Sequence, residues 1–501
     1  MNVLYPVVTR SLSATRADSV GDKDLLHTSW AEADRLKAGD RAGGSTDFKH
    51  LTLNLTMIAG KITGLIVTDV RFPTSLGHHG SDAMHTDPDY SAAYVVIETD
   101  ADDGLKGYGL TFTLGKGTEI VVCAVKALSR HVVGRALEDI VTDFRRFYRQ
   151  LTSDGQLRWI GPEKGVIQLA TSAVLNAVWD LWAKKEKKPL WKLLTDMSPI
   201  QLLSCIDFRY ITDALSEDEA LEILQNGKRG QEEREEYIEK NGYPAYTTSC
   251  AWLGYSDEQL QKLCTNALKD GWTRFKVKVG ADLEDDKRRC KLIRSMIGPD
   301  NQMMLDANQR WDVNEAVQCV SELASFKPLW IEEPTSPDDI LGHATISKAL
   351  SPLGIGVATG EQCHNRVMFK QFLQANALQY LQIDSCRLGS VNENLAVLLM
   401  AKKFNIPVCP HAGGVGLCEL VQHLIIFDYI SVSGSLENRM CEYVDHLHEH
   451  FKYPVSIHHA AYMPPKDPGY STEMKEESVL QYQFPDGEVW HQLIIDKKVE
   501  V

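Results

Sequence analysis

The sequence lacks the features that mark several common classes of protein. Its 11 cysteines include no C-x-x-C pair, which favours free thiols in a reducing compartment over a disulfide scaffold. No uninterrupted apolar run reaches about eighteen residues, so we expect no membrane-spanning helix. Positive charge is not in excess, because 53 Lys and Arg residues stand against 68 Asp and Glu, a formal net charge of −15. That balance argues against a general binder of nucleic acids or anionic membranes, and we expect a soluble intracellular protein.

Phosphate-binding motifs are absent as well. No G-x-G-x-x-G turn opens a helix after a strand, and the Gly-rich pieces "TLGKGT" and "HAGGVG" fail the P-loop spacing. An open, doubly wound nucleotide-binding sheet is therefore the weaker of the two interpretations of the α/β pattern described below.

The N-terminal segment differs in composition from the rest of the chain. Arginines among serines in residues 1–60 hint at a transit peptide, whereas Asp18, Asp22 and Asp24 are wrong for one. We expect a poorly ordered extension here, and the residues leave organelle targeting open.

Residues 61–195 have the pattern of an α+β domain. Strand-like segments run from Ile62 to Phe72 and through "SAAYVVIETD" and "GLKGYGLTFT". From Glu119 to Leu194 apolar residues recur near every third or fourth position, which predicts helices. Strands followed by a run of helices are typical of an α+β domain. The charge-dense stretch from Asn226 to Gly242 is predicted to be a solvated helix or an insertion.

From about residue 245, short apolar segments alternate with helix-like stretches. The eight segments are "YTTSCAWLG", "RFKVKVG", "QMMLDANQ", "PLWIEEP", "IGVATGE", "LQYLQIDSCR", "IPVCPHAGG" and "CEYVDHL". Alternating strands and helices imply parallel βαβ units. Eight such units imply a closed (β/α)₈ barrel, which we place in residues 196–445.

Each barrel segment from the second to the seventh ends in a charged residue. The series is Lys278, Asp306, Glu332, Glu361, Asp384 and His411, at intervals of 28, 26, 29, 23 and 27 residues. One such residue per βα unit, at the C-terminal end of its strand, is the layout of a barrel active site. A single strand-end carboxylate is more often a helix cap, but six in register are hard to explain that way.

Three of these residues predict a metal site. Asp306, Glu332 and Glu361 come from consecutive strands, and three converging carboxylates need a cation. All-oxygen ligation selects a hard ion, Mg²⁺ first and Mn²⁺ as the alternative. We do not expect the histidines of "HLHEH" (residues 446–450) to bind metal.

The remaining polar residues predict two proton-transfer groups. Lys276 and Lys278 share one face of their strand, and Asp384 and His411 end neighbouring strands, so they could form an Asp–His pair. A lysine beside a divalent cation and a second lysine is disfavoured as an ammonium. We therefore expect the pKa of Lys278 to fall toward neutrality, which would make it a base at physiological pH.

In combination these motifs resemble the enolase superfamily, within it the mandelate-racemase-like acid-sugar dehydratases, and most closely the L-fuconate dehydratases. The resemblance covers roughly residues 61–480 and is carried by "KVK", "DAN", "IEEP", "GE" and "D…H", in that order. It implies that residues 61–195 form a domain that caps the barrel and that residues 446–501 return to it. In "IEEP" it makes Glu332 the ligand and turns Glu333 away. It also makes mitochondrial location an expectation, with the cytosol as the alternative.

The resemblance further implies a substrate site. The expected substrate-binding residues are Gly80, Ser81, Asp82, Tyr90, Lys276, Asn308 and Glu442. Lys276 would bind the substrate carboxylate, and Glu437 is a rival to Glu442. The implied reaction converts L-fuconate to 2-keto-3-deoxy-L-fuconate. Lys278 or His411 would take the C2 proton, Mg²⁺ would stabilise the enediolate, and the C3 hydroxyl would leave.

Three alternatives stay open at this point. A racemase or epimerase would use the same two bases and expel no leaving group. A non-catalytic regulatory protein could retain the fold, and an interaction protein could use the acidic surface. The expected partner is a small acid sugar, and a homo-oligomer is compatible with the exposed faces of a barrel.

Overall fold

The structure is a computed structural model that describes residues 60–496 and residue 498. The predicted extension, with its targeting features, therefore lies outside the described residues.

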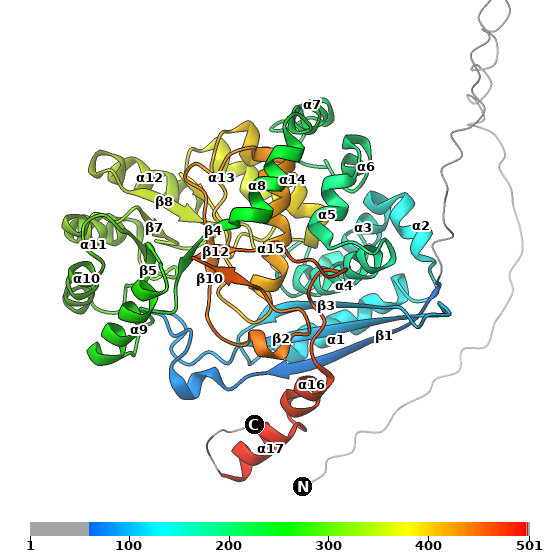
Figure 1. The fold of residues 1–501 in the computed structure, drawn as a ribbon, viewed down its shortest axis with the longest axis horizontal. Coiled ribbons are helices and arrows are strands. Elements are labelled where there is room, and N and C mark those ends of the chain that lie inside the picture. The colour runs from blue at the N-terminus through cyan, green and yellow to red at the C-terminus, as the bar shows by residue number, and fades with distance from the viewer. Residues whose placement is uncertain (1–59, 497, 499–501) are drawn as a thin grey trace, which may run out of the picture. The chain divides into compact units, whose positions relative to one another are not determined.

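A three-stranded antiparallel sheet opens the described chain (Figure 1). Its strands, in spatial order, are β1 (Ile62–Arg71), β2 (Ser91–Thr99) and β3 (Lys106–Thr113). The helices that follow are α1 (Thr118–Leu128), α2 (Leu137–Thr142), α3 (Phe144–Thr152), α4 (Gly165–Lys185) and α5 (Leu190–Asp196). We call β1–β3 and α1–α5 the capping domain.

Helix α4 packs closely on β3 because both elements carry small residues at the contact. A β-carbon built at Gly109 would lie 2.3 Å from the Ala177 backbone nitrogen and 2.4 Å from the Ala173 carbonyl oxygen. Only glycine fits such an approach of strand and helix. The length and composition of α4 would suit a membrane span, but 83% of its apolar window is buried inside the protein. It is the core helix of this domain.

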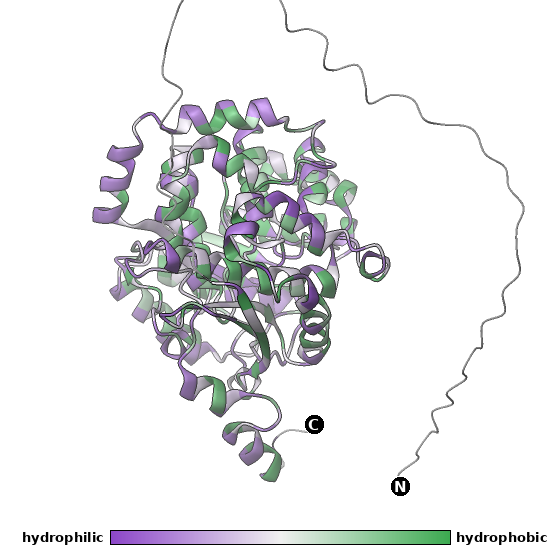
Figure 2. Ribbon diagram, turned by 90° about the vertical axis from the view of Figure 1, so that its right-hand side faces the viewer, coloured by the Kyte–Doolittle hydropathy of each residue, from purple (hydrophilic) through white to green (hydrophobic). Residues whose placement is uncertain are grey.

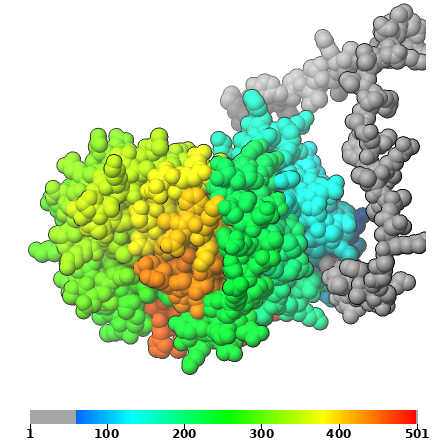
Figure 3. Space-filling model, turned by 90° about the horizontal axis from the view of Figure 1, so that it is seen from above, coloured from blue at the N-terminus to red at the C-terminus, as the bar shows by residue number. Residues whose placement is uncertain are grey.

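Three helices connect the capping domain to the barrel: α6 (Pro199–Ser204), α7 (Glu217–Gly227) and α8 (Gln231–Asn241). Helix α8 is the predicted solvated helix, and Ile238 is its one buried residue. In the space-filling view this segment lies directly against the capping domain (Figure 3), where Arg145 donates to Glu217 over 2.8 Å.

The barrel is built from parallel strands in chain order. They are β4 (Tyr243–Thr247), β5 (Arg274–Lys278), β6 (Gln302–Asp306), β7 (Trp330–Glu332), β8 (Gly356–Thr359), β9 (Tyr380–Leu381) and β10 (Cys441–Tyr443). The seventh predicted segment forms a single bridge, Val408 to Leu381, rather than a strand. Closure comes from β10, which pairs in parallel with β4 and donates a hydrogen bond from its Glu442 amide to the Pro410 carbonyl.

One helix follows each of the first seven predicted barrel segments, that is, the six strands β4 to β9 and the segment around Val408. They are α9 (Asp257–Lys269), α10 (Leu283–Ile297), α11 (Val313–Leu323), α12 (Ile340–Leu350), α13 (Arg366–Gln374), α14 (Ser390–Lys403) and α15 (Leu417–Phe427). In the described part of the chain, no barrel helix follows β10. The barrel prediction is thus correct in seven of its eight strands, and the structure is one helix short of a full (β/α)₈ repeat.

After β10 the chain first forms β11 (Ile457–His458) and β12 (Ala461–Tyr462), and β12 pairs antiparallel with β4 of the barrel. It then reaches the capping sheet with α16 (Glu476–Tyr482) and α17 (Glu488–Ile495). Gln483 bridges to Val70 of β1, and the Trp490 indole donates to the Arg71 carbonyl over 2.8 Å. These contacts tie the C-terminal segment to the capping domain.

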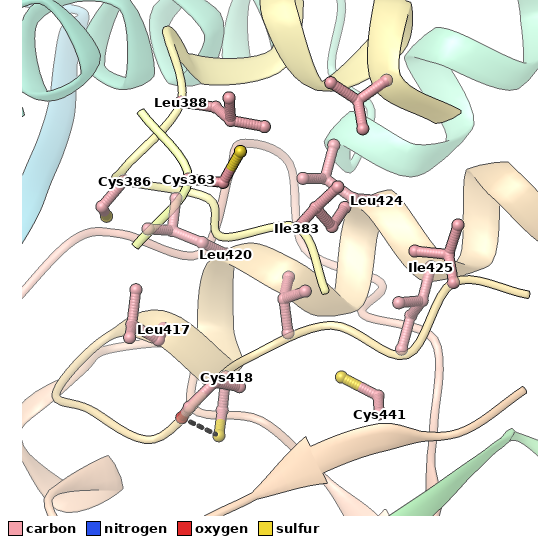
Figure 4. Packing of buried hydrophobic residues seen from close by; sticks show 14 of the residues in the cluster. Cys363, Ile383, Cys386, Leu388, Leu417, Cys418, Leu420, Leu424, Ile425 and Cys441 are labelled. Atoms are coloured by element: carbon pink, nitrogen blue, oxygen red, sulfur yellow. Dashed lines mark hydrogen bonds between the residues drawn. The ribbon is translucent and has the colours of Figure 1, made fainter. Parts of the chain in front are cut away.

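Apolar residues gather on the inner faces of the elements, whereas polar residues colour the outer faces (Figure 2). All 11 cysteines are free thiols, as predicted, and ten of them are buried. Figure 4 labels four of the ten, Cys363, Cys386, Cys418 and Cys441, which pack with Leu and Ile like small apolar residues.

Candidate active site

Strand β5 places both of its lysines inside the barrel. Phe275 and Val277 alternate with them and pack in the apolar core, so the lysine face must turn inward. Lys276 is 1% exposed and Lys278 is 8% exposed. Two buried ammonium groups require negative partners, and the neighbouring strands supply them.

Lys276 is surrounded by carboxylates. Its Nζ lies 2.6 Å from Glu442, 2.8 Å from Glu332 and 3.1 Å from Asp306. Beneath it the barrel is filled by Tyr246, Met304, Trp330, Ala358, Cys409 and Met440. Burial opposes its charge, yet the carboxylates, Glu332 first, hold the pKa of Lys276 well above its ordinary value. Lys276 thus neutralises buried acids.

Lys278 is two residues after Lys276, at the C-terminal end of β5, and lies nearer the barrel mouth. Its Nζ donates to Asp306 over 2.6 Å and to Asn308 over 2.9 Å. Burial lowers the pKa of Lys278, but the negative charge of Asp306 outweighs burial, so the pKa lies above the ordinary value. The protein's own charges, above all Asp306, thus oppose the expected fall toward neutrality. That expectation concerns the lysine beside a bound cation, and for that state it stays a prediction.

Three carboxylates converge beside these lysines. Asp306 of β6 pairs in register with Glu332 of β7, and Glu361 follows β8 by two residues. One oxygen of each lies within 4.8 Å of the other two. Glu361 Oε2 is buried and has no hydrogen-bond partner among the described residues. An all-oxygen set with an unpartnered carboxylate oxygen fits a hard divalent cation such as Mg²⁺.

Burial and the repulsion between neighbouring carboxylates disfavour the ionised form of this group, which further positive charge would stabilise. Burial, reinforced by the neighbouring charge of Asp306, raises the pKa of Glu332 to about 8. Glu333, next in sequence, lies outside the group, with its carboxylate accepting from Gln309 over 2.9 Å. Its backbone has a φ of 41°, which is how the chain turns this second acid away from the barrel interior.

His411 and Asp384 form a buried pair at the other side of the barrel. His411 Nδ1 lies 2.7 Å from Asp384 Oδ2, and Asp384 Oδ1 accepts from the amides of Cys386 and Arg387. These amides fix the carboxylate, which in turn fixes the imidazole. Burial disfavours the imidazolium, but Glu361 and then Asp384 raise the pKa of His411 to about 9.

A cavity of about 330 Å³ joins these groups to the capping domain. That volume suits a small-molecule ligand. From the barrel come the residues we call the cavity floor: Lys278, Asn308, Glu361, Asp384, His411 and Glu442. From β3, α1 and α4 come the apolar residues we call the capping wall: Phe112, Leu114, Ile120, Val121, Val166 and Leu169.

The expected substrate contacts divide into two groups. Gly80, Asp82, Tyr90, Asn308 and Glu442 line the cavity. Two others do not line it. The Ser81 hydroxyl donates to the Thr86 carbonyl over 2.8 Å, so the side chain is used to shape its own loop. Lys276 is enclosed by three carboxylates below the floor, which leaves no access for a substrate carboxylate.

The rival positions lie elsewhere. Glu437 is exposed on the loop before β10, whereas Glu442 accepts from the Ala412 amide over 3.0 Å beside His411. The histidines after β10 point to separate partners: His448 pairs with Glu419, His450 with Ser478, and His446 stacks on Tyr90.

The cavity is also lined by polar and aromatic residues that sequence analysis did not single out, among them His85, Thr248, Trp252 and Arg387. Thr248 directly follows β4, so the rule of one polar residue per strand end could have found it. Arg387 donates its Nε to the Glu361 carbonyl over 3.1 Å. His85 lies 3.0 Å from Asp82 in the loop before β2, and no strand periodicity marks it.

Comparison with known proteins agrees with this architecture. Residues 66–195 match the mandelate racemase / muconate lactonizing enzyme N-terminal domain, and residues 259–478 match the enolase C-terminal domain-like family. The two matches span more than half of the chain. The protein therefore belongs to the enolase superfamily, in its mandelate-racemase-like group.

Individual relatives sharpen this placement. The chain is 85% identical over 445 residues to Mitochondrial enolase superfamily member 1 of Xenopus laevis, covering 89% of this chain and 100% of the relative. The crystal structure of the human protein of that name is 79% identical, with a TM-score of 0.86, over 87% of this chain and 99% of that one. L-galactonate dehydratase of Hypocrea jecorina is 52% identical over 427 residues, 85% of this chain and 94% of the relative.

Proposed function

We propose that this protein is a Mg²⁺-dependent dehydratase that converts an acid sugar, L-fuconate first, into its 2-keto-3-deoxy acid. The observation that carries the proposal is the cavity floor, where Lys278 and the His411–Asp384 pair face one cavity beside three converging carboxylates. The similarity to an L-galactonate dehydratase supports the substrate class. L-fuconate is L-galactonate without the C6 hydroxyl.

Asp306, Glu332 and Glu361 would hold the cation. Bound there, Mg²⁺ would offset the negative charge that develops on the substrate carboxylate as the C2 proton leaves. The chain's own residues bind and orient the rest of the substrate: Asn308 and Glu442 from the barrel, Asp82 and Tyr90 from the capping domain.

Proton transfer falls to Lys278 and His411. One of them takes the C2 proton, and the electron pair of that C–H bond forms the C2–C3 double bond as the C3–O bond breaks. The departing hydroxyl takes a proton from the other of the two groups and leaves as water, and the enol product becomes the 2-keto-3-deoxy acid as its C2 hydroxyl loses a proton and C3 gains one. Asp384 holds the proton on His411 Nδ1 and leaves Nε2 directed at the cavity.

Two proton-transfer groups from the second and seventh barrel segments also suit a racemase or epimerase. In that reaction the C2 proton would leave to one group and return from the other, with the C3 hydroxyl retained.

The test is an assay of the purified full-length protein with Mg²⁺ and a panel of acid sugars that includes L-fuconate and L-galactonate. We expect a 2-keto-3-deoxy product, detected as its semicarbazone, with L-fuconate. Epimerised acid without keto product would favour the second candidate. Absence of both reactions for every acid would favour a non-catalytic protein on this fold.

The compartment is part of the same proposal. Relatives 85% and 79% identical to this chain carry the word mitochondrial in their name, and we propose that this protein acts in the mitochondrion too. A full-length fusion to a fluorescent protein should co-localise with a mitochondrial dye, and diffuse cytosolic signal would contradict this location.

A further inference from the structure

Strand β5, which carries both lysines, is held unequally by its two neighbours. Five residue pairs join it to β6, and the last of them is Lys278 with Asp306. A single pair, Thr247 with Phe275, joins it to β4. Beyond Thr247 the chain runs as a loop, which we call the β4 loop (residues 248–256). Because β4 ends there, other groups must hold the β4 side of Lys278.

Arg289 of α10 takes the place of the missing strand. Its Nη1 donates to the Lys278 carbonyl over 2.6 Å, and its Nη2 donates to the Ala251 and Trp252 carbonyls over 2.9 and 3.2 Å. The Ala251 carbonyl also accepts from the Lys278 amide over 3.2 Å. One planar guanidinium therefore joins the end of β5 to the β4 loop.

This guanidinium is buried, since Arg289 is only 2% exposed. A buried charge needs hydrogen-bonded partners, and the three carbonyls supply them. Asp286, one turn earlier on α10, lies 4.0 Å from its Nη1 and accepts from the Gly280 amide over 2.7 Å. Gly280 has a φ of 107°, which marks the turn that leaves β5. Two side chains of α10 thus fix the backbone of Lys278 and the turn that follows it.

Both segments that Arg289 joins reach the cavity. Lys278 and Trp252 line it, whereas Arg289 does not. A lysine ammonium sits on a flexible four-carbon stem, so its position depends on where the backbone holds the stem. Misplacing a reacting group by about 1 Å can cost roughly 100-fold in rate.

We propose that Arg289 is a positioning residue for Lys278, which fixes the end of β5 against the β4 loop so that the ammonium is aimed into the cavity. The inference rests on the proposed function for what Lys278 does there. How Lys278 is held rests on the hydrogen bonds of Arg289 alone.

Arg294 provides a matched control on the same helix. Its guanidinium also donates to backbone carbonyls, those of Phe326, Gly298 and Asn301, over 3.0, 3.0 and 2.7 Å. These carbonyls precede β7 and β6, at the end of the barrel opposite the cavity. Both arginines therefore stabilise loops of the barrel, but only Arg289 holds a residue of the cavity floor.

The test compares Arg289→Met, Arg289→Lys and Arg294→Met by urea unfolding and by kinetics with L-fuconate and Mg²⁺. Both methionine variants should have a lower urea midpoint than wild type. We expect only Arg289→Met to lower kcat about 100-fold, with KM within about threefold of wild type, because the proton-transfer group is misplaced while the substrate contacts remain. Arg289→Lys should recover part of kcat, since one ammonium can reach the Lys278 carbonyl but cannot join both segments.

Two kinetic results would overturn the proposal. One is an equal kcat in Arg289→Met and Arg294→Met, which would leave Arg289 a purely structural role. The other is a rise in KM without a fall in kcat, which would assign Arg289 to substrate binding. If Arg289→Met does not fold, Arg289→Lys is compared with Arg294→Lys on the same terms.

Amide hydrogen exchange separates this inference from the proposed function. In Arg289→Lys, peptides that cover residues 248–254 and 276–282 should exchange about tenfold faster than in wild type, and Arg294→Lys should change neither. If the wild-type protein transforms no acid sugar but exchange changes in this way, the positioning role stands and the proposed function fails. If the wild-type protein is active and Arg289→Lys alters neither exchange nor kcat, the proposed function stands and the positioning role fails. An inactive wild-type protein with unchanged exchange would contradict both.

Discussion

The cavity floor and the capping wall enclose the same cavity but are built on opposite principles. The floor holds a buried lysine, carboxylates and an imidazole, and Lys278, His411 and Glu442 are each fixed by an ion pair or a hydrogen bond below 3 Å. The wall holds apolar side chains. The one titratable residue that lines the cavity beside them is Lys116, at its rim. Under the proposed function, the barrel would perform proton transfer and the capping domain would contact the part of the substrate that does not react.

Lys278→Ala should have the largest effect. It removes one of the two proton-transfer groups, so kcat for L-fuconate should fall about 10³-fold or more while KM changes little. Steady-state kinetics with Mg²⁺ measure it. Lys287→Ala, at a surface ion pair on α10, is the control and should retain kcat. A Lys278→Ala enzyme within tenfold of wild type would place the chemistry elsewhere.

Lys276→Met tests whether Lys276 stabilises the folded protein by neutralising buried acids rather than by taking part in catalysis. The substitution leaves Asp306, Glu332 and Glu442 buried without their shared ammonium, which should lower the free energy of unfolding by about 3–5 kcal/mol. Urea unfolding in EDTA measures it, and added Mg²⁺ should restore part of the loss. A change below about 1 kcal/mol would mean that Lys276 is not the neutralising charge.

Asp384→Asn tests the orientation of His411. The amide keeps the shape of the carboxylate and its bonds from the Cys386 and Arg387 amides but loses the charge that fixes the imidazole. We expect kcat to fall about 10²-fold. Asp154→Asn is the matched control, since Asp154 pairs with His131 at 3.2 Å in the capping domain, away from the cavity. Equal effects of the two substitutions would contradict the assignment.

Phe112→Leu should have the smallest effect, and the effect should be on KM rather than on kcat or stability. Trimming the wall removes apolar contact with the non-reacting end of the substrate, worth about 1 kcal/mol, so KM should rise about fivefold with kcat nearly unchanged. Phe404→Leu, on the partly buried outer side of the barrel, should leave KM unchanged. A fall in kcat without a rise in KM would give the wall a catalytic rather than a binding role.

The floor could be predicted from sequence because it follows one rule. In a parallel barrel, each strand delivers its C-terminal residue to the same end, so Lys278, Asp306 and the residues that follow in register had to converge. Strand alternation also predicted that Lys276 lies on the same face as Lys278. It could not predict that Lys276 is closed off, because that depends on three carboxylates from other strands.

The wall could not be predicted in the same way. Phe112, Ile120 and Val166 belong to a strand and two helices whose apolar residues read as ordinary core positions, and 54 residues separate the first from the last. Their common surface depends on how α4 packs on β3, an approach set by Gly109 and its alanine neighbours. The missing eighth helix has a similar cause, since the chain after β10 is used to bind the capping sheet.

The most direct test of the account follows the C2 proton and the C3 hydroxyl together. Full-length wild-type protein is incubated with L-fuconate in D₂O, with Mg²⁺ or with EDTA, and the mixture is analysed by NMR. The account predicts 2-keto-3-deoxy-L-fuconate in Mg²⁺ and none in EDTA. Deuterium at C2 of recovered acid without any keto product, or turnover that is indifferent to EDTA, would contradict it.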